Sequence, residues 1–274
     1  MHRLIKSILP ATAAIALLLF AALWSAAGCS MYEEPEQAQI EKEVVADLGS
    51  EQTPISPKRV NVSLVDITVS LKANEVDRNR SLSVRVFRGA VRPGDAWTTA
   101  TISNDSFSPA QTYFDQIFPP APVCPTPVPP EPANPFLATA TPDDRPETCE
   151  ATFRTKFEAV IDTAAAELEG GRWEPVQGTD IVGALFKAGL LFEAAPTAAT
   201  CNLIIYSDMA DTAGLILPVK LQGVNVVVVL SENNPALFTR AREDWSQFLV
   251  RAGAADVHFV HAGVRAETIV SLLR

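Results

Sequence analysis

Three short stretches of the chain carry oxygen-bearing side chains next to apolar runs. The first is DITVS at 66–70, the second is GTD at 178–180, and the third is SD at 207–208. Carboxylates and hydroxyls, with no Cys or His among them, suit hard cations such as Mg²⁺, Mn²⁺ or Ca²⁺ better than zinc. The candidate ligands of a divalent cation, with Mg²⁺ the leading choice, are therefore Asp66, Thr68, Ser70, Thr179 and Asp208.

The first stretch interrupts a strand pattern. In NVSLVDITVSLK (61–72) the apolar residues alternate with polar ones, but the phase of the alternation changes at Asp66. A regular strand keeps its phase, because successive side chains point to opposite faces of the sheet. We therefore expect the strand to end near Val65. The chain should then bend so that its oxygens converge while Ile67 and Val69 pack inward.

Apolar patterning along the rest of the chain predicts alternating strands and helices. Strands are expected at 60–66, 96–103, 202–208, 224–231 and 255–260, and helices at 150–171, 179–194, 234–253 and close to the C-terminal end. Residues 111–118 fit a further strand, whereas 73–91 fit either a helix or a strand. Five consecutive aliphatic residues at 226–230 indicate a strand covered on both faces. The segment between 208 and 224 is too short for a full crossover helix.

This alternation predicts an α/β fold with a doubly wound, mostly parallel sheet and helices on both faces. Ligands of such sheets bind at the carboxyl ends of the strands, where the strand order reverses. The three polar stretches should therefore meet at one edge of the sheet.

The ordered set of motifs resembles the von Willebrand factor A domain with its metal-ion-dependent adhesion site. That family carries Asp-x-Ser-x-Ser after the first strand, a Thr on a later loop and an Asp after the fourth strand. Here DITVS, GTDIVGAL and IIYSDMAD supply these residues, and the resemblance covers about residues 60–274. It departs at Thr68, where Ser is usual, and at Val69 and Met209, where Gly is common.

The resemblance implies a binding role for each residue. The hydroxyls of Thr68 and Ser70 would touch the metal, and the carboxylates of Asp66 and Asp208 would bind it largely through water. Thr179 would join or leave the shell as the site changes state. An acidic residue of a protein ligand would take the open position, so the expected function is metal-dependent protein binding and not catalysis.

Other interpretations of the same residues stay open. Thr179 or Asp180 could simply cap a helix. A metal-free scaffold could use the same fold, with a proline-rich loop as its contact surface. A metal-assisted phosphohydrolase built on Asp66 is less favoured, because DIT lacks a second carboxylate two residues on and the chain has no Gly-Lys-Ser/Thr phosphate loop. A nucleic-acid partner is not expected, because 32 acidic residues outnumber 22 Lys and Arg and no basic stripe is present.

The N-terminal residues have the layout of a bacterial lipoprotein. Residues 1–28 combine two basic residues, an apolar run and small residues, which is typical of a signal peptide. The sequence AAGC at 26–29 resembles a lipobox, in which Cys29 is lipidated; ordinary secretion and an uncleaved anchor are the alternatives. Residues 29–58 are expected to form a disordered acidic tether, which would hold the domain at 59–274 on the non-cytoplasmic side of a membrane of the cell envelope.

A proline-rich stretch at 119–146 holds 11 of the 21 prolines and cannot form a helix or a paired strand. We expect an insertion loop, although a peptide ligand for a partner is an alternative. Cys124 and Cys149 flank this stretch and form the natural disulfide pair outside the cytoplasm. Three thiols besides Cys29 allow three pairings; this one leaves Cys201 as a buried free thiol.

Overall fold

A computed structural model describes residues 56–108, 111–124, 146–171, 173–214, 217–231 and 235–274. The predicted signal peptide, the lipidation site Cys29, nearly all of the tether and most of the proline-rich insert lie outside these residues. None of the helices in the described ranges combines the length and the apolar character of a membrane-spanning segment.

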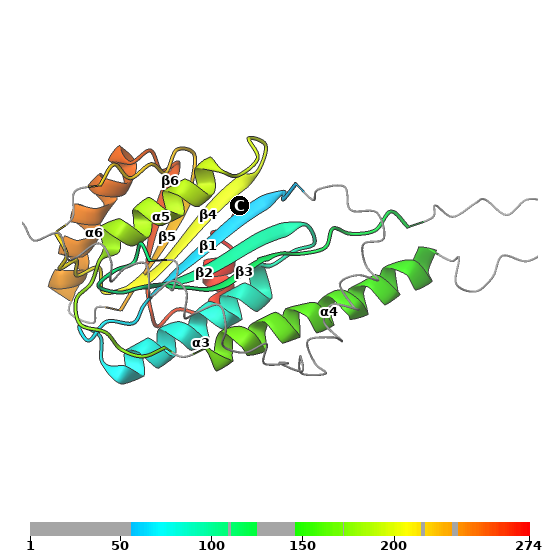
Figure 1. Cartoon of the computed structure of the whole chain (residues 1–274), viewed down its shortest axis with the longest axis horizontal. Helices are drawn as coiled ribbons and strands as arrows, with labels where there is room; N and C mark the ends of the chain where they lie inside the picture. Colours follow the sequence, from blue (N-terminus) through cyan, green and yellow to red (C-terminus); the bar gives the residue numbers. More distant parts are fainter. Residues whose placement is uncertain (1–55, 109–110, 125–145, 172, 215–216, 232–234) are drawn as a thin grey trace, which may run out of the picture. The chain divides into compact units, whose positions relative to one another are not determined.

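The fold is a six-stranded α/β sheet, as the sequence predicts (Figure 1). The strands are β1 (Arg59–Asp66), β2 (Asp95–Ile102), β3 (Thr112–Ile117), β4 (Thr200–Ser207), β5 (Asn225–Leu230) and β6 (Asp256–His261). They are arranged in the order β3-β2-β1-β4-β5-β6, and all pairs are parallel except the antiparallel pair of β2 and β3. The order reverses between β1 and β4, so a ligand site is expected at their carboxyl ends.

The helices are α3 (Ala73–Ala90), α4 (Pro146–Gly170), α5 (Ile181–Glu193), α6 (Pro235–Arg251) and α7 (Ala266–Val270). The segment at 73–91, for which the sequence left helix and strand open, is therefore helical. Its first turn is stabilised by Glu75, whose side chain accepts a 3.0 Å hydrogen bond from the Lys72 backbone N–H. No helix connects β4 to β5 within the described residues, which agrees with the short spacing predicted there.

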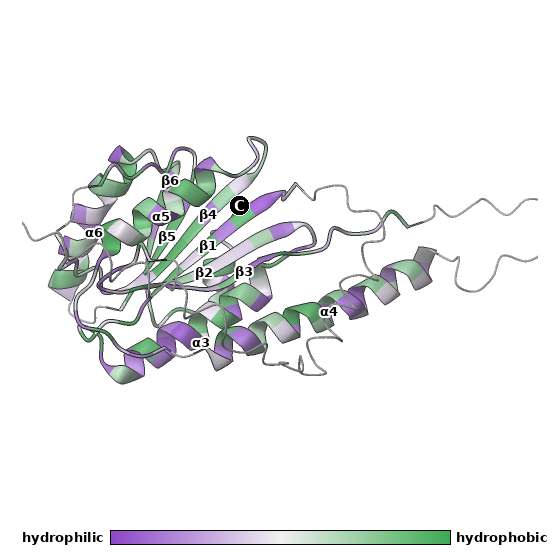
Figure 2. Cartoon of the chain, in the orientation of Figure 1, coloured by the Kyte–Doolittle hydropathy of each residue, from purple (hydrophilic) through white to green (hydrophobic). Residues whose placement is uncertain are grey.

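Two apolar layers cover the sheet (Figures 1 and 2). On one face α5 and α6 pack on alternate strand residues such as Leu64, Ile205 and Val228. On the other face α3 packs against α4 and α7, and the Phe87 ring contacts Trp97 edge-on at 5.2 Å. Strand β5 is buried along its whole length, as its unbroken aliphatic run predicts.

The disulfide between Cys124 and Cys149 is present, with their Cα atoms 5.8 Å apart, and it confirms the predicted pair. Cys201 is free, as expected, but its side chain is only half-buried. The prediction of full burial is wrong because this residue lies near the start of β4, before the most deeply buried part of the strand.

Candidate metal centre

The first strand ends where the alternation of the sequence changes phase. β1 stops at Asp66, and the following residues form a bridge with a distant segment, in which the Val69 N–H donates to the Val176 carbonyl at 3.0 Å. The chain then turns, since the Leu71 N–H bonds the Thr68 carbonyl at 3.1 Å. Ile67 packs inward as expected, but Val69 is 50% exposed. The inward placement of Val69 is wrong because the turn directs it to solvent.

This turn gathers the three oxygen-bearing side chains of DITVS. The Asp66 carboxylate accepts two hydrogen bonds from Thr68 on its Oδ1 atom, one from the backbone N–H at 2.9 Å and one from the hydroxyl at 2.7 Å. The Thr68 hydroxyl also lies 2.8 Å from the Ser70 hydroxyl. Asp66 and Thr68 are fully buried, whereas Ser70 is exposed. The cluster therefore reaches from the end of the strand to solvent.

Thr179 joins this cluster from the loop that precedes α5. Its hydroxyl donates to the Thr68 hydroxyl at 3.0 Å. Its backbone is held on both sides, because its N–H donates to the Thr212 hydroxyl at 2.7 Å and its carbonyl accepts the Thr212 N–H at 2.9 Å. The helix cap is the neighbouring residue, Asp180, whose carboxylate accepts the Gly183 N–H at 2.7 Å. Capping therefore explains Asp180 but not the position of Thr179.

Asp208 follows β4 and stands at the edge of the cluster. Its carboxylate is half-buried and accepts a 3.0 Å hydrogen bond from the Ala210 N–H. The next residue, Met209, has a left-handed backbone with φ of 62°, which is unfavourable for a residue with a Cβ atom. Such strain is found where the surrounding structure holds it in place, commonly at binding sites.

Ser207 is a member of the cluster that the family motif does not assign. Its hydroxyl donates to Asp66 Oδ2 at 2.6 Å and accepts the Met209 N–H at 2.8 Å. The Ser207 hydroxyl therefore links the end of β4 to the end of β1, and it bonds the Asp66 oxygen that Thr68 does not contact. The only sequence signal was its place directly after the apolar run of β4.

The buried Asp66 carboxylate lies in an electrostatically unfavourable environment. Burial raises the pKa of Asp66 above its usual value, and the nearby charge of Asp208 raises it further, while hydrogen bonds from Ser207 and Thr68 oppose the shift. Within the described ranges neither Asp66 nor Asp208 forms an ion pair. A positive ion beside the two carboxylates would offset both their repulsion and the cost of burying Asp66.

The donor set fits a hard cation. One buried carboxylate and three hydroxyls converge from two loops, with a second carboxylate alongside, and all donors are oxygen. No group of three or more His, Cys, Asp or Glu side chains able to hold a metal occurs in the described part of the chain. Hydroxyl groups would therefore have to supply part of the coordination at this site.

Comparisons with known proteins reveal no matching sequence family and no matching curated protein. The solved structures that resemble this chain include the following two. A von Willebrand factor type A protein from Catenulispora acidiphila has a TM-score of 0.43 and 13% identity, with 78% of this chain and 41% of that chain covered. The human COPII-coat protein Sec24c has a TM-score of 0.36 and 10% identity, with 79% and 32% covered. This chain therefore spans less than half the length of either, and its function has to be argued from its own side chains.

Proposed function

We propose that the chain is a protein-binding module that uses a divalent cation, with Mg²⁺ as the preferred ion, and that it belongs to the von Willebrand factor A type. The observation that carries this proposal is the convergence of Asp66, Thr68, Ser70 and Thr179 at the point where the strand order reverses. Asp208 stands beside them, and its charge acts on the buried Asp66 carboxylate.

The exposure of Ser70 supports a role in binding a partner. A cation held by Asp66, Thr68 and Ser70 would lie below an exposed hydroxyl, within reach of another protein. Hard cations prefer six or more oxygen ligands, so a carboxylate from the partner could complete the shell. In the setting that the N-terminal sequence predicts, Cys29 would anchor this module through a lipid to a bacterial membrane, with the module on the non-cytoplasmic side.

A metal-free scaffold is the second candidate, and one observation favours it. The hydroxyls of Thr68, Ser70 and Thr179 already satisfy one another and the Asp66 carboxylate through hydrogen bonds. Such a network is complete without an ion. The partner would then contact the same edge of the domain, or the proline-rich loop, with no dependence on a cation.

Calorimetric titration of the protein with MgCl₂ and MnCl₂ separates the two candidates. The wild type should bind one ion, Asp66→Asn should bind none, and Ser70→Ala should bind about tenfold more weakly, equivalent to roughly 1.4 kcal/mol. Ser81→Ala is the matched control, because Ser81 is also exposed but lies on α3. The absence of ion binding in the wild type would overturn the metal-dependent proposal and leave the scaffold.

A further inference from the structure

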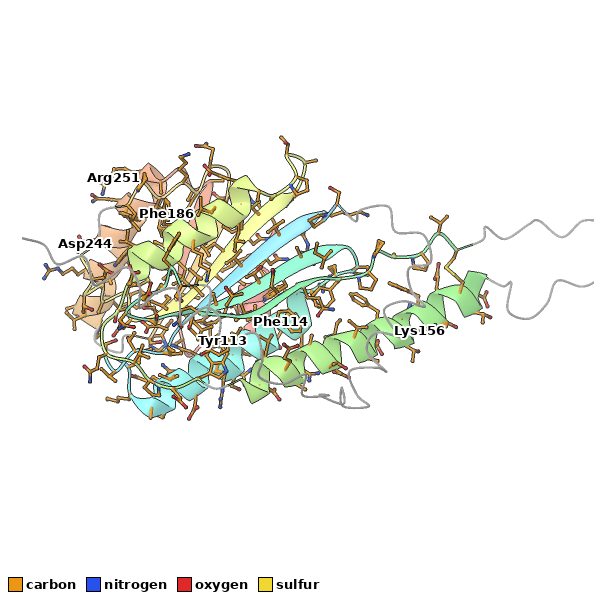
Figure 3. All side chains as sticks on the ribbon, viewed as in Figure 1. Tyr113, Phe114, Lys156, Phe186, Asp244 and Arg251 are labelled. Carbon is orange, nitrogen blue, oxygen red and sulfur yellow. A yellow bond between two sulfur atoms is a disulfide. The ribbon has the colours of Figure 1, made fainter. Side chains whose placement is uncertain are left out.

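A cleft of about 390 Å³ lies directly beside the candidate metal centre. One wall is the loop after β4, with Asp208, Met209 and Ala210, and the other wall is α6. Figure 3 labels Asp244, one of the residues of α6 that line the cleft. Asp208 belongs to both the cleft and the candidate centre, so a ligand bound at one would lie next to the other.

The loop wall of the cleft is fixed by contacts on three sides. The indole N–H of Trp245 on α6 donates to the Met209 carbonyl at 2.9 Å. The Met209 N–H is held by Ser207, and the Met209 side chain is buried in the core beneath α5 and α6. These contacts maintain the left-handed backbone of Met209. The cleft is therefore preformed, and a ligand would not have to order this wall on binding.

The cleft combines apolar walls with an open mouth. Ala241 and Trp245 supply apolar surface, and Leu237 in the first turn of α6 is half-exposed at the edge. Five of the eight residues that line the cleft are apolar, and the other three, Asp208, Arg240 and Asp244, are charged. An aromatic or aliphatic anchor in such a pocket commonly contributes much of the binding energy of an interface.

The charges around the cleft indicate an uncharged occupant. Arg240 and Asp244 lie one helical turn apart, with their charged groups 3.7 Å from each other, so they offset each other. Asp208 would be offset by the cation at the proposed centre. With the cation bound, the lining residues would carry no net charge, so the cleft would not select a charged side chain.

We infer that this cleft is the second contact point of the partner, and that it takes one large uncharged apolar side chain such as Leu, Met or Phe. The inference rests on the proposed function, because the same loop of the partner would place its carboxylate on the cation. Three extended residues span roughly 10 Å. Because Asp208 borders both the cleft and the candidate centre, the apolar residue should lie within about three positions of the acidic one.

Selection from a displayed peptide library tests this inference. The library carries one fixed Asp flanked on each side by four random residues and is selected on the whole protein in MgCl₂. We expect the recovered peptides to be enriched in Leu, Met or Phe within three positions of the Asp. Their affinity should fall about tenfold or more in Ala210→Trp, which blocks the mouth, and several-fold in Leu237→Gln.

A matched control variant and thermal unfolding test whether the cleft variants lose binding only because the protein is destabilised. Val250→Gln removes a similarly exposed apolar side chain from the same helix, away from the cleft, and should leave peptide binding unchanged. Ala210 is exposed and Leu237 is half-exposed, so both cleft variants should unfold at nearly the wild-type temperature.

Each outcome bears on one of the two proposals. Peptides that need the apolar residue, are blocked by Ala210→Trp and bind equally well in EDTA would support the cleft and overturn the metal-dependent function. Peptides that need Mg²⁺ but bind Ala210→Trp as tightly as wild type would support the function and overturn the cleft. Recovery of no peptide, or of peptides without apolar enrichment, would also overturn the cleft.

Discussion

Ser207 at the end of β4 donates a 2.6 Å hydrogen bond to Oδ2 of Asp66 at the end of β1, across 141 residues of sequence. These two strands are neighbours at the point where the strand order of the sheet reverses. The bond holds a fully buried carboxylate in one orientation, and Thr68 holds its other oxygen. The candidate centre is therefore built on the rigid ends of two strands.

Because Asp66 is buried, the free energy of unfolding of the metal-free protein should depend on pH. Burial raises the pKa of Asp66 above its usual 3.8. At pH values between 3.8 and the raised pKa, the folded state therefore binds more protons than the unfolded state. This group's contribution to stability is present below about pH 3.8 and is lost as the pH rises through the raised pKa. Asp66→Asn removes the ionisable group and should avoid this loss.

Thermal unfolding in EDTA at pH 4 and pH 7 measures the effect. The melting temperature of Asp66→Asn, relative to that of wild type, should be higher at pH 7 than at pH 4. The expected increase is roughly 2–4 °C for each kcal/mol of unfolding free energy that ionisation of Asp66 removes from the wild type. Added Mg²⁺ should stabilise only the wild type. Asp77→Asn is the control, because Asp77 is largely exposed and should show little change. An unchanged difference between the two pH values would contradict the prediction.

Trp245 should support ion binding from a distance. Trp245→Phe removes the N–H that holds the Met209 carbonyl at 2.9 Å but keeps an aromatic ring against Phe248. Loss of one hydrogen bond should lower the free energy of unfolding by about 1 kcal/mol. Because the freed loop carries Asp208, the affinity for Mg²⁺ in calorimetry should also fall several-fold.

Trp173→Phe provides a matched comparison. Its indole N–H also bonds a single backbone carbonyl, that of Leu168 at 3.3 Å, and its ring stacks on Tyr113, away from α6. It should therefore lose similar stability with no change in Mg²⁺ affinity. Equal affinities in the two variants would show that Trp245 has only a structural role.

The sequence predicts the fold best in those elements whose pattern of apolar residues is set by burial in the core. The aliphatic run of β5 and the amphipathic pattern of α4 led directly to the observed elements. The segment at 73–91 remained ambiguous because SLSVRVF at 81–87 alternates polar and apolar residues as a strand does, although it lies within the amphipathic helix α3. The antiparallel direction of β3 could not be predicted, because it depends on pairing with β2.

For the candidate centre, the sequence identified residue types but not their contacts. It grouped Asp66, Thr68, Ser70 and Thr179, which the structure brings together through hydrogen bonds. It did not assign Ser207, and it placed Val69 inside. Both depend on how the chain turns after β1 and on which strand lies beside it, and neither is encoded in the local alternation of apolar residues.

Three buried asparagines form a hydrogen-bonded ladder at the end of the sheet opposite the candidate metal centre, and we expect this ladder to stabilise the fold. Asn61, Asn202 and Asn225 lie side by side on β1, β4 and β5 and are buried. Asn202 donates to Asn61 at 2.9 Å and accepts from Asn225 at 3.1 Å and from the Arg274 N–H at 3.0 Å. The ladder thereby holds the backbone that follows α7.

Asn202→Leu should break this ladder. It leaves buried polar groups without partners, which costs about 1–3 kcal/mol per group, and urea unfolding should show a loss of at least this size. Hydrogen exchange at 272–274 should also become faster. Asn74→Leu, at an exposed position in α3, should change stability by less than about 0.5 kcal/mol. Wild-type stability in Asn202→Leu would rule out a structural role for the ladder.

The Cys124–Cys149 disulfide should act locally on α4. It joins the first turn of the helix to the segment after β3, whereas the first buried apolar side chain of the helix is Phe157. Reduction should therefore speed hydrogen exchange at 147–156 and leave 160–170 and the central strands protected, because the buried side chains of α4 begin at Phe157. Exchange measured by mass spectrometry with and without reductant, in a Cys201→Ser background that removes the free thiol, checks this. Loss of protection throughout β4 and β5 would instead show that the disulfide stabilises the whole domain, for which loop-closure entropy sets a scale of about 3 kcal/mol.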